Sequence, residues 1–293
     1  VARYLWMGTF HSVFARILRS EAESLGYTSN YTIYDTIDSK NLIKKIIKEL
    51  GLDDKTYKPG EIYGRISSAK NNLITSKAYA SNQQIIIQDQ KSKRPRVSEI
   101  FMMYSNRCKK ADAMDFDDLL LNTNILFRDF PNILEKYQNK FKYILVDEYQ
   151  DSNRAQFHLI KNLYRAGHNY LCVVGDEDQS IYRFRGAEVS NILDFEHVFE
   201  GTQVIRLEEN YRSTQTIVRA ASRVVERNES RIGKDLWTSN GKGSAIYWSL
   251  LPNDLAEARF CARILFEGKT SFNETAILYR NNYQSRPLES VFT

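Results

Sequence analysis

The sequence is poor in residues that form covalent or metal cross-links, and it has no long apolar run. Its three cysteines, Cys108, Cys172 and Cys261, lie far apart, and only four histidines accompany them. Because no CxxC pair occurs, we expect neither a disulfide framework nor a zinc site. No apolar stretch approaches the roughly 20 residues that a helix needs to cross a bilayer. The sequence therefore predicts a soluble protein with no membrane span, and we expect it in the cytoplasm.

Positive charge is concentrated in one segment of the 293 residues, whose net charge is +5. Residues 28–113 contain 16 Lys and Arg against 9 Asp and Glu, so this segment carries a surplus of seven positive charges and the rest is slightly acidic. Basic surface of this kind binds phosphate backbones by releasing condensed counterions. A solvated, lysine-rich helical face explains the same charge distribution, and charge alone does not separate the two interpretations.

The spacing of apolar residues divides the chain into blocks. Apolar residues three, four and seven apart predict a helix over residues 13–25, which Gly26 ends. Residues 28–113 have the composition of a basic, mostly helical insertion. From Asp115 onward, short apolar strands alternate with helices, which predicts a parallel sheet. The expected strands are 143–146, 170–174, 204–207, 245–250 and 276–279, and the expected helices lie near 156–164, 217–227 and 255–266.

The first chemical signal is the segment ILVDEYQD at residues 144–151. An apolar strand ends there in two adjacent carboxylates, at the edge where α/β sheets bind their ligands. Asp147 is suited to hold Mg²⁺ through water, because this ion gives up its hydration shell reluctantly. Glu148 is suited to accept a proton from an attacking water. A solvated strand end, with Asp147 or Asp151 capping the next helix, is the alternative.

The next expected strand ends in a similar way, in VVGDEDQSIYRFRGA at residues 173–187. The amide of Gln179 can bond a terminal phosphate or the attacking water. Beyond it, Tyr182, Phe184 and Arg185 combine aromatic faces, which stack on any base, with a cation that holds the backbone. This composition favours sequence-independent binding of single-stranded DNA. A packed turn with two core aromatic residues is the alternative.

A third cluster, LEENYRS, occupies residues 207–213. The ring of Tyr211 is suited to stack on adenine. Arg212 is suited to reach a transferring phosphate as an arginine finger from a second domain, which would couple domain closure to hydrolysis. The alternative is an ordinary surface start of a helix.

Together these segments resemble the superfamily 1 DNA helicases of the UvrD/Rep/PcrA type. In that family DEYQD is the Walker B motif, GDxDQSIYRxRGA couples nucleotide to DNA, and NYRS begins the second RecA-like domain. Further matches are GTFHS at residues 8–12, DFDDLL at 115–120 and ILYRNNYQSRPLE at 277–289. The six motifs follow the family's order along the whole chain.

The resemblance implies an ATP-dependent DNA helicase that uses ATP and Mg²⁺, translocates 3′ to 5′ on single-stranded DNA and acts at junctions of single- and double-stranded DNA. DNA repair is the expected role. The residues implied in ATP chemistry are Asp147 for Mg²⁺, Glu148 as the base, Gln179 as phosphate sensor, Arg212 as the finger and Tyr211 as the adenine stack.

The residues that the resemblance implies in DNA binding fall into two sets. Thr9 and His11 would contact the backbone. Tyr182, Phe184 and Arg185 would contact bases and phosphates. Relatives usually carry tryptophan at the position of Phe184, so the stacking face is smaller in this chain.

The implied fold is α/β, with a RecA-like parallel-sheet domain of the P-loop NTPase class, a helical insertion, and the start of a second RecA-like domain. The expected boundaries give residues 1–27 and 114–201 to the first domain. Residues 28–113 form the insertion, and 202–293 form part of the second domain.

No GxxxxGK[ST] P-loop occurs in the sequence, although the family requires one to cradle the phosphates. In relatives the P-loop lies upstream of GTFHS. We therefore expect the chain to be the middle of a longer helicase, without the Walker A region and the later motifs of the second domain, and inactive alone. Two alternatives stay open: a non-catalytic DNA-binding or interaction module, and the motor part of a helicase–nuclease.

Overall fold

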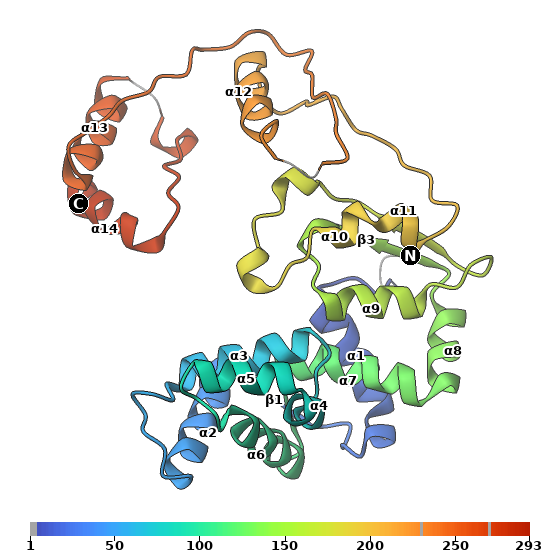
Figure 1. The fold of residues 1–293 in the computed structure, drawn as a ribbon. Helices are drawn as coiled ribbons and strands as arrows, with labels where there is room; N and C mark the ends of the chain where they lie inside the picture. The colour runs from blue at the N-terminus through green and yellow to red at the C-terminus, as the bar shows by residue number, and fades with distance from the viewer. Residues whose placement is uncertain (1–4, 229–230, 269–270) are drawn as a thin grey trace. The chain divides into compact units, whose positions relative to one another are not determined.

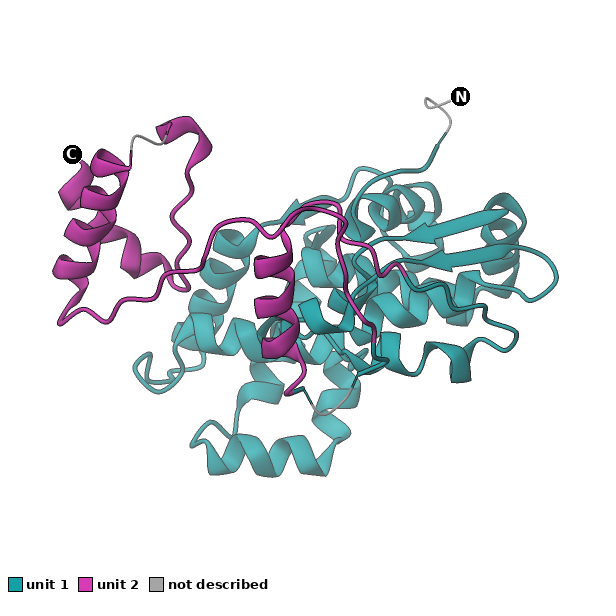
Figure 2. Ribbon diagram, turned by 90° about the horizontal axis from the view of Figure 1, so that it is seen from above, with its two compact units in different colours: residues 1–206, 228–233 teal, residues 207–227, 234–293 magenta. Residues whose placement is uncertain are grey.

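The computed structural model describes residues 5–228, 231–268 and 271–293 (Figure 1). They form two compact units, coloured separately in Figure 2. Unit 1 is Val1–Arg206 with Asn228–Gly233, and unit 2 is Leu207–Arg227 with Lys234–Thr293. The domain boundaries expected from the sequence are a finer division than these units and stay predictions. No helix in the three described ranges is long and apolar enough to span a membrane.

The chain begins with helix α1 (Phe10–Glu21), which confirms the first predicted helix. Thr9 caps it, because its Oγ1 accepts a hydrogen bond from the backbone N–H of Ser12 at 3.3 Å. The last predicted turn is a 3₁₀ helix, η2 (Ala22–Leu25), and Gly26 ends it at φ 68°, a conformation that glycine adopts without steric cost.

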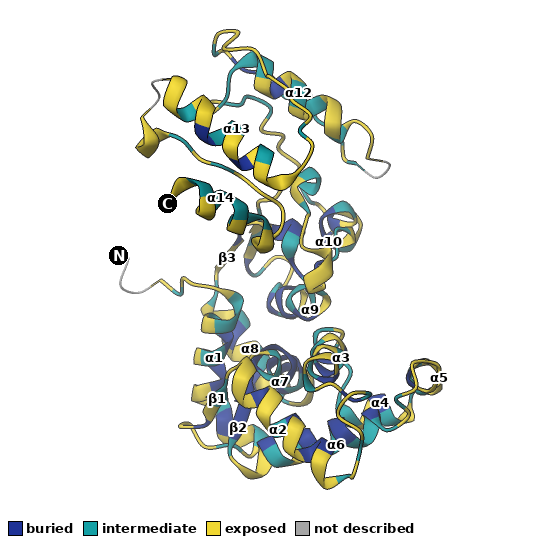
Figure 3. Ribbon diagram, turned by 90° about the vertical axis from the view of Figure 1, so that its left-hand side faces the viewer, coloured by how far each residue is buried: buried dark blue, intermediate teal, exposed yellow. Residues whose placement is uncertain are grey.

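The basic segment is a helical subdomain that starts and ends on paired strands. Strand β1 (Thr32–Tyr34) pairs in parallel with β2 (Ala113–Asp115), with Thr32 opposite Ala113. Apolar faces of the intervening helices form a hydrophobic core of their own, seen as dark blue residues along α2 and α6 in Figure 3. These helices are α2 (Thr36–Glu49), α3 (Pro59–Asn71), α4 (Ser76–Ser81), α5 (Gln83–Lys91) and α6 (Val97–Lys110).

The remainder of unit 1 is built around a second parallel pair. Strand β3 (Tyr143–Val146) pairs with β4 (Tyr170–Val173), so the first two predicted strands are confirmed, the second one residue shorter. Helices and turns pack around the pair and share one core with α1. They are α7 (Phe116–Asp129), α8 (Pro131–Lys140), η3 (Tyr149–Asp151), α9 (Arg154–Leu163), α10 (Ser190–Leu193) and α11 (Phe195–Val198). Two further 3₁₀ turns, η4 (Glu177–Gln179) and η5 (Arg183–Arg185), follow β4 and bury no residue.

The two faces of the β3–β4 pair differ in burial. Ile144 and Val146 face the core, whereas Tyr143 and Leu145 on the other face are 71% and 77% exposed. Parallel sheets are normally covered on both faces. The pair therefore has one apolar face that no described residue covers fully.

Unit 2 contains helices α12 (Gln215–Val225), α13 (Asp254–Glu267) and α14 (Ser285–Phe292), and the short turns η6 (Phe272–Glu274) and η7 (Asn282–Gln284). The two helices predicted here are confirmed, and α13 packs against α14. The strands predicted at residues 204–207, 245–250 and 276–279 are wrong. Apolar patterning favours a strand only where a neighbour completes the hydrogen-bond ladder. In the described ranges these three segments pair with no other strand.

A buried ion cluster joins the insertion to the rest of unit 1. Lys70 on α3 has a side chain that is 1% exposed, and its Nζ lies 2.7 Å from Asp115 Oδ2 and 2.8 Å from Asp118 Oδ1. The hydroxyl of Tyr104 on α6 donates to the same Asp115 oxygen at 2.7 Å. Burial and the neighbouring Asp115 raise the pKa of the Asp118 carboxyl to about 7. One ammonium group thus balances two carboxyl groups at the start of α7.

Replacing Lys70 with methionine is expected to lower the free energy of unfolding by about 3–5 kcal/mol, because two buried carboxyl groups would lose their cation. Urea denaturation followed by circular dichroism at about pH 8, where Asp118 is mostly ionised, measures the change. Lys44→Met, on the exposed face of α2, is the matched control and should stay within about 0.5 kcal/mol of the parent. Equal stability of the two variants would contradict the role of the cluster.

Candidate functional site

Strands β3 and β4 end in acidic loops at the same edge of their sheet. Asp147 and Glu148 follow β3, and Asp176 and Glu177 follow β4 after two linking residues. The hydrogen-bond ladder continues beyond the strands, since the N–H of Tyr149 donates to the carbonyl oxygen of Val174 at 2.9 Å. The two loops therefore leave the sheet side by side, which is the geometry that two consecutive parallel strands were expected to give.

Glu148 adopts a left-handed backbone conformation, with φ 50° and ψ 42°. Few residues with a Cβ occupy this region, and such positions cost about 1–3 kcal/mol and concentrate at functional sites. Its N–H donates to Asp147 Oδ1 at 2.9 Å, which stabilises the turn. The adjacent carboxylates thus occupy a tight turn that leads into the 3₁₀ helix η3, where Glu148 is at the N-cap position and no side chain caps the helix. The alternative in which Asp147 or Asp151 caps the next helix is wrong, because Asn153 caps α9.

The buried side chain of Gln150 connects the two loops. It is 1% exposed, its Nε2 donates to Glu148 Oε2 at 2.7 Å, and its Oε1 accepts from the N–H of Asp176 at 3.0 Å. Asp176 Oδ2 in turn accepts from Gln179 Nε2 at 2.7 Å. A chain of hydrogen bonds therefore runs from Glu148 to Gln179, the two residues predicted to act on water and phosphate.

The loop after β4 approaches Gln150 at Gly175. A Cβ at this position would lie 2.7 Å from Gln150 Oε1 and 2.8 Å from Ile192 Cδ1. Real Cβ atoms do not come this close to other heavy atoms, so an added Cβ would displace the ends of both side chains, and the backbone nitrogen of Tyr149 at 3.2 Å leaves the loop little room to move away.

Residues predicted to bind DNA lie around a cavity of about 560 Å³ in unit 1. The guanidinium carbon of Arg185 lies 5.1 Å from the ring centre of Tyr182 and 5.5 Å from that of Phe184, so cation and rings form one surface. Phe184 is 71% exposed beside the cavity, and Thr9, which caps α1, is outside its lining. The lining residues are His11, Ser67, Asn71, Asp117, Asp151, Asn153, Gln156, Tyr182 and Arg185.

A polar network shared by three helices forms one side of this cavity. Asn153, the N-cap of α9, donates through Nδ2 to Asn71 Oδ1 at 2.7 Å, and Asn71 donates to Asp117 Oδ1 at 2.8 Å. Burial lowers the pKa of His11 in spite of the opposing charge of Asp117. This shift favours the neutral imidazole, which offers the cavity hydrogen bonds without adding positive charge.

Tyr211 and Arg212 belong to unit 2. They are therefore separate from the residues at the ends of β3 and β4 and from those around the cavity, which all belong to unit 1. Asn210 Oδ1 accepts from the N–H groups of Arg212 and Ser213 at 3.1 and 2.8 Å, which forms a tight turn before α12. The ring of Tyr211 is 77% exposed, and its hydroxyl donates to Glu209 Oε2 at 2.7 Å. Both side chains thus extend from a defined turn at a helix start.

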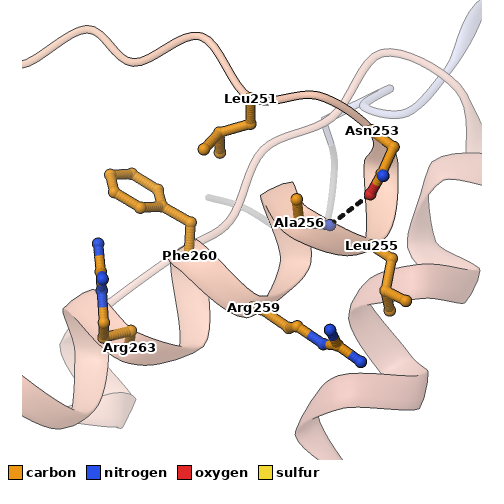
Figure 4. Close-up of a pocket in the computed structure, with 7 residues that line it drawn as sticks. All are labelled: Leu251, Asn253, Leu255, Ala256, Arg259, Phe260 and Arg263. Carbon is orange, nitrogen blue, oxygen red and sulfur yellow. Dashed lines mark hydrogen bonds between the residues drawn. The ribbon is translucent and has the colours of Figure 1, made fainter.

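Unit 2 also contains a cavity of about 400 Å³ at the start of α13 (Figure 4). Asn253 caps the helix there, with Oδ1 accepting from the N–H of Ala256 at 2.8 Å. Its lining contains no carboxylate and none of the residues that the sequence predicted to bind ATP, Mg²⁺ or DNA. It consists of Leu251, Asn253, Leu255, Ala256, Arg259, Phe260 and Arg263.

Comparison with known proteins identifies the family. The profile of the UvrD/REP helicase N-terminal domain matches residues 1–200, and that of the UvrD-like helicase C-terminal domain matches residues 205–293. The chain belongs to the UvrD/REP helicase family. Membership confirms the resemblance seen in the six motifs and implies a RecA-like P-loop fold for this UvrD/REP chain.

Similar UvrD/REP proteins include three bacterial proteins, each named ATP-dependent DNA helicase PcrA. That of Bacillus subtilis (strain 168) is 45% identical over 98% of this chain and 38% of its own length. That of Staphylococcus aureus (strain Mu50) is 43% identical over 99% of this chain and 39% of its own. That of Leuconostoc citreum is 41% identical over 99% and 38%. The chain thus spans about two fifths of the length of these relatives.

The sequence analysis did not single out four residues that the structure places at this UvrD/REP site. Gln150 and Asp176 lie inside recognised motifs, so their position next to predicted residues was the available signal. Asn71 and Asn153 carry no such signal, because they meet only through the fold. The roles predicted for the site residues stay predictions.

Substituting alanine for Gly175 is expected to lower the free energy of unfolding by about 1–3 kcal/mol, because the added Cβ forces the loop away from Gln150. Chemical denaturation measures the effect. Gly64→Ala is the control: Gly64 is exposed within α3, nothing lies within 4 Å of an added Cβ, and the change should be neutral or stabilising by up to about 1 kcal/mol. A Gly175→Ala variant as stable as the parent would show that the loops tolerate a wider spacing.

Proposed function

We propose that this chain is part of an ATP-dependent DNA helicase that hydrolyses ATP with Mg²⁺ and moves 3′ to 5′ on single-stranded DNA. The observation that carries the proposal is the hydrogen-bond chain from Glu148 through Gln150 and Asp176 to Gln179, at the ends of two parallel strands. The names of the PcrA relatives support ATP and DNA as the ligands.

Asp147 is the residue proposed to hold Mg²⁺. Its carboxylate is the hard oxygen ligand that this ion prefers, and one protein carboxylate is sufficient where water and phosphate oxygens complete the coordination. Bound ATP with Mg²⁺ would supply the transferable phosphoryl group and neutralise its charge. The exposed position of Asp147 at the strand end fits this donor set.

Glu148 is proposed to accept the proton of the attacking water. Because Gln150 donates to Oε2, the carboxylate is held in one orientation and Oε1 is the oxygen assigned to the water. One N–H of the Gln179 amide is bonded to Asp176, and the second is assigned to the terminal phosphate. Gln150 thus sets the orientation of both groups from one buried position.

Unit 2 is proposed to contribute Arg212 as the finger that stabilises charge on the transferring phosphoryl group, and Tyr211 as the ring that stacks on adenine. The turn at Asn210 fixes the backbone of both residues. In this proposal ATP draws the two units together and hydrolysis releases them.

The DNA strand is proposed to run along the cavity of unit 1. Tyr182 and Phe184 stack on bases, Arg185 binds backbone phosphate, and His11 and Thr9 bond the backbone. The basic insertion at residues 28–113 is proposed to bind duplex phosphates, which would place its charge at a junction of single- and double-stranded DNA.

We also propose that the chain is the central part of a longer protein. The proposal rests on the missing P-loop motif and on the share of the relatives' length that the chain covers. Catalysis is therefore assigned to the longer protein, and this chain alone is expected to hydrolyse ATP weakly or not at all.

Glu148→Gln in the longer protein is expected to lower kcat for ATP hydrolysis by about 100-fold or more, because the amide cannot take the proton of the attacking water. DNA-stimulated hydrolysis, and unwinding of duplexes with a 3′ or a 5′ tail, measure activity and direction. The parent should unwind only the 3′-tailed duplex. Glu196→Gln, exposed on α11, is the control that keeps activity. A parent protein without hydrolysis would favour the non-catalytic module.

Phe184→Leu is expected to weaken binding of a single-stranded oligonucleotide by about 1–3 kcal/mol through loss of base stacking. Phe184→Trp should strengthen it, because its stacking face is larger. Fluorescence anisotropy with this chain at fixed salt measures both. Phe272→Leu removes an exposed ring from unit 2, at 61% exposure against 71% for Phe184, and serves as the control. Equal losses from both leucine substitutions would argue against stacking at Phe184.

A further inference from the structure

The loop that carries Gln179 is held internally by Asp176. Asp176 Oδ1 accepts from the N–H of Asp178 at 3.0 Å, and Oδ2 accepts from Gln179 Nε2 at 2.7 Å. The N–H of Gln179 also donates to the carbonyl oxygen of Asp176 at 3.0 Å. The orientation of the Gln179 amide therefore depends on the conformation of η4.

The next carboxylate, Asp178, is held by a residue far along the chain. Its side chain is 5% exposed, and the guanidinium of Arg231 meets it with two nitrogens: Nε lies 2.9 Å from Oδ1, and Nη2 lies 2.7 Å from Oδ2. Arg231 is itself only 18% exposed. Paired hydrogen bonds of this kind fix geometry as well as charge.

Two further contacts join the same parts of the molecule. Asn228 Nδ2 donates to Asp178 Oδ1 at 3.2 Å, and the N–H of Ile232 donates to Glu177 Oε1 at 3.2 Å. We call Asn228–Gly233 the return segment. Its described residues, 228 and 231–233, belong to unit 1, although the residues before and after it, through Arg227 and from Lys234, belong to unit 2 (Figure 2). The loop that carries Gln179 is thus hydrogen-bonded to residues that follow α12 in the sequence.

We propose that Arg231 is a positioning residue for Gln179. Through Asp178 it fixes η4, and through the chain it connects the Gln179 loop to the helix that follows Arg212. This inference rests on the proposed function, because it assigns Arg231 to the control of the same phosphate site. A buried carboxylate that loses its cation is strongly destabilised, so removal of Arg231 frees Asp178 to move toward solvent and η4 moves with it.

Amide hydrogen exchange of this chain without nucleotide tests the first step. In Arg231→Met the amides of Gln179 and Ser180 should exchange about tenfold faster or more, since their bonds within η4 open more often. The amide of Val174, bonded to Val146 across the sheet, should be unchanged, which shows that the fold is intact. Arg231→Lys keeps the charge but not the paired hydrogen bonds, so its exchange rates at Gln179 and Ser180 should lie between those of the parent and of Arg231→Met. Arg227→Met, an exposed arginine four residues earlier, is the matched control.

Steady-state kinetics of the longer protein test the second step. Arg231→Met should lower kcat about tenfold while the KM for ATP and the affinity for single-stranded DNA stay unchanged, because phosphate sensing is disturbed and binding is not. Asp178→Asn should match it, and the double variant should be no worse than either single one. Arg231→Lys should recover part of kcat.

Three results would overturn the inference. Unchanged exchange at Gln179 in Arg231→Met would show that the ion pair does not hold η4. Faster exchange with unchanged kcat would limit Arg231 to a structural role. If Arg227→Met changed amide exchange and kcat as much as Arg231→Met does, the effect would not be specific to Arg231. If the parent protein hydrolyses no ATP, the proposed function fails, whereas the exchange experiment still decides whether Arg231 holds the loop.

Discussion

The arrangement of unit 1 depends on one ammonium group, that of Lys70, shared by the carboxyl groups of Asp115 and Asp118. Because separating buried charges is costly, α3 stays at the start of α7. The next residue, Asn71, is thereby held against Asp117 and Asn153, where the insertion meets α9. The insertion contributes Asn71 to one side of the cavity. The ion cluster that holds this residue in place does not itself line the cavity.

At the edge of the β3–β4 sheet, too, one buried side chain holds groups from two segments together. Here the side chain is a neutral amide, that of Gln150, in place of a charged ammonium group. Gln150 uses both ends of one buried amide, donating to Glu148 and accepting from Asp176. An amide suits this position because it has a donor and an acceptor, whereas a carboxylate there would repel Glu148. Gly175 permits the close approach that these bonds need. Backbone geometry and one side chain together orient groups from two strands.

The sequence predicted best where information is local. The strand at residues 143–146, the helix end at Gly26 and the carboxylates after β3 depend on neighbours within a few positions. Prediction failed where the outcome depends on distant partners. The apolar segment 245–250 has the composition of a strand, yet without a neighbouring strand it forms none. Asp178 and Arg231, 53 positions apart, carry no periodic signal of their contact.

Chain connectivity limits how the second unit can act on the first, whatever arrangement the two units take. Arg212 lies six residues beyond Arg206, the last residue of unit 1 before α12, and Arg231 lies six residues beyond Val225, where α12 ends. Six residues of extended chain reach about 20 Å. While the ion pair with Asp178 holds, both ends of the segment that contains Arg212 and α12 are tethered within that distance of unit 1. The finger role proposed for Arg212 would have to be exerted within this range, and the ion pair between Arg231 and Asp178 would set one of its two limits.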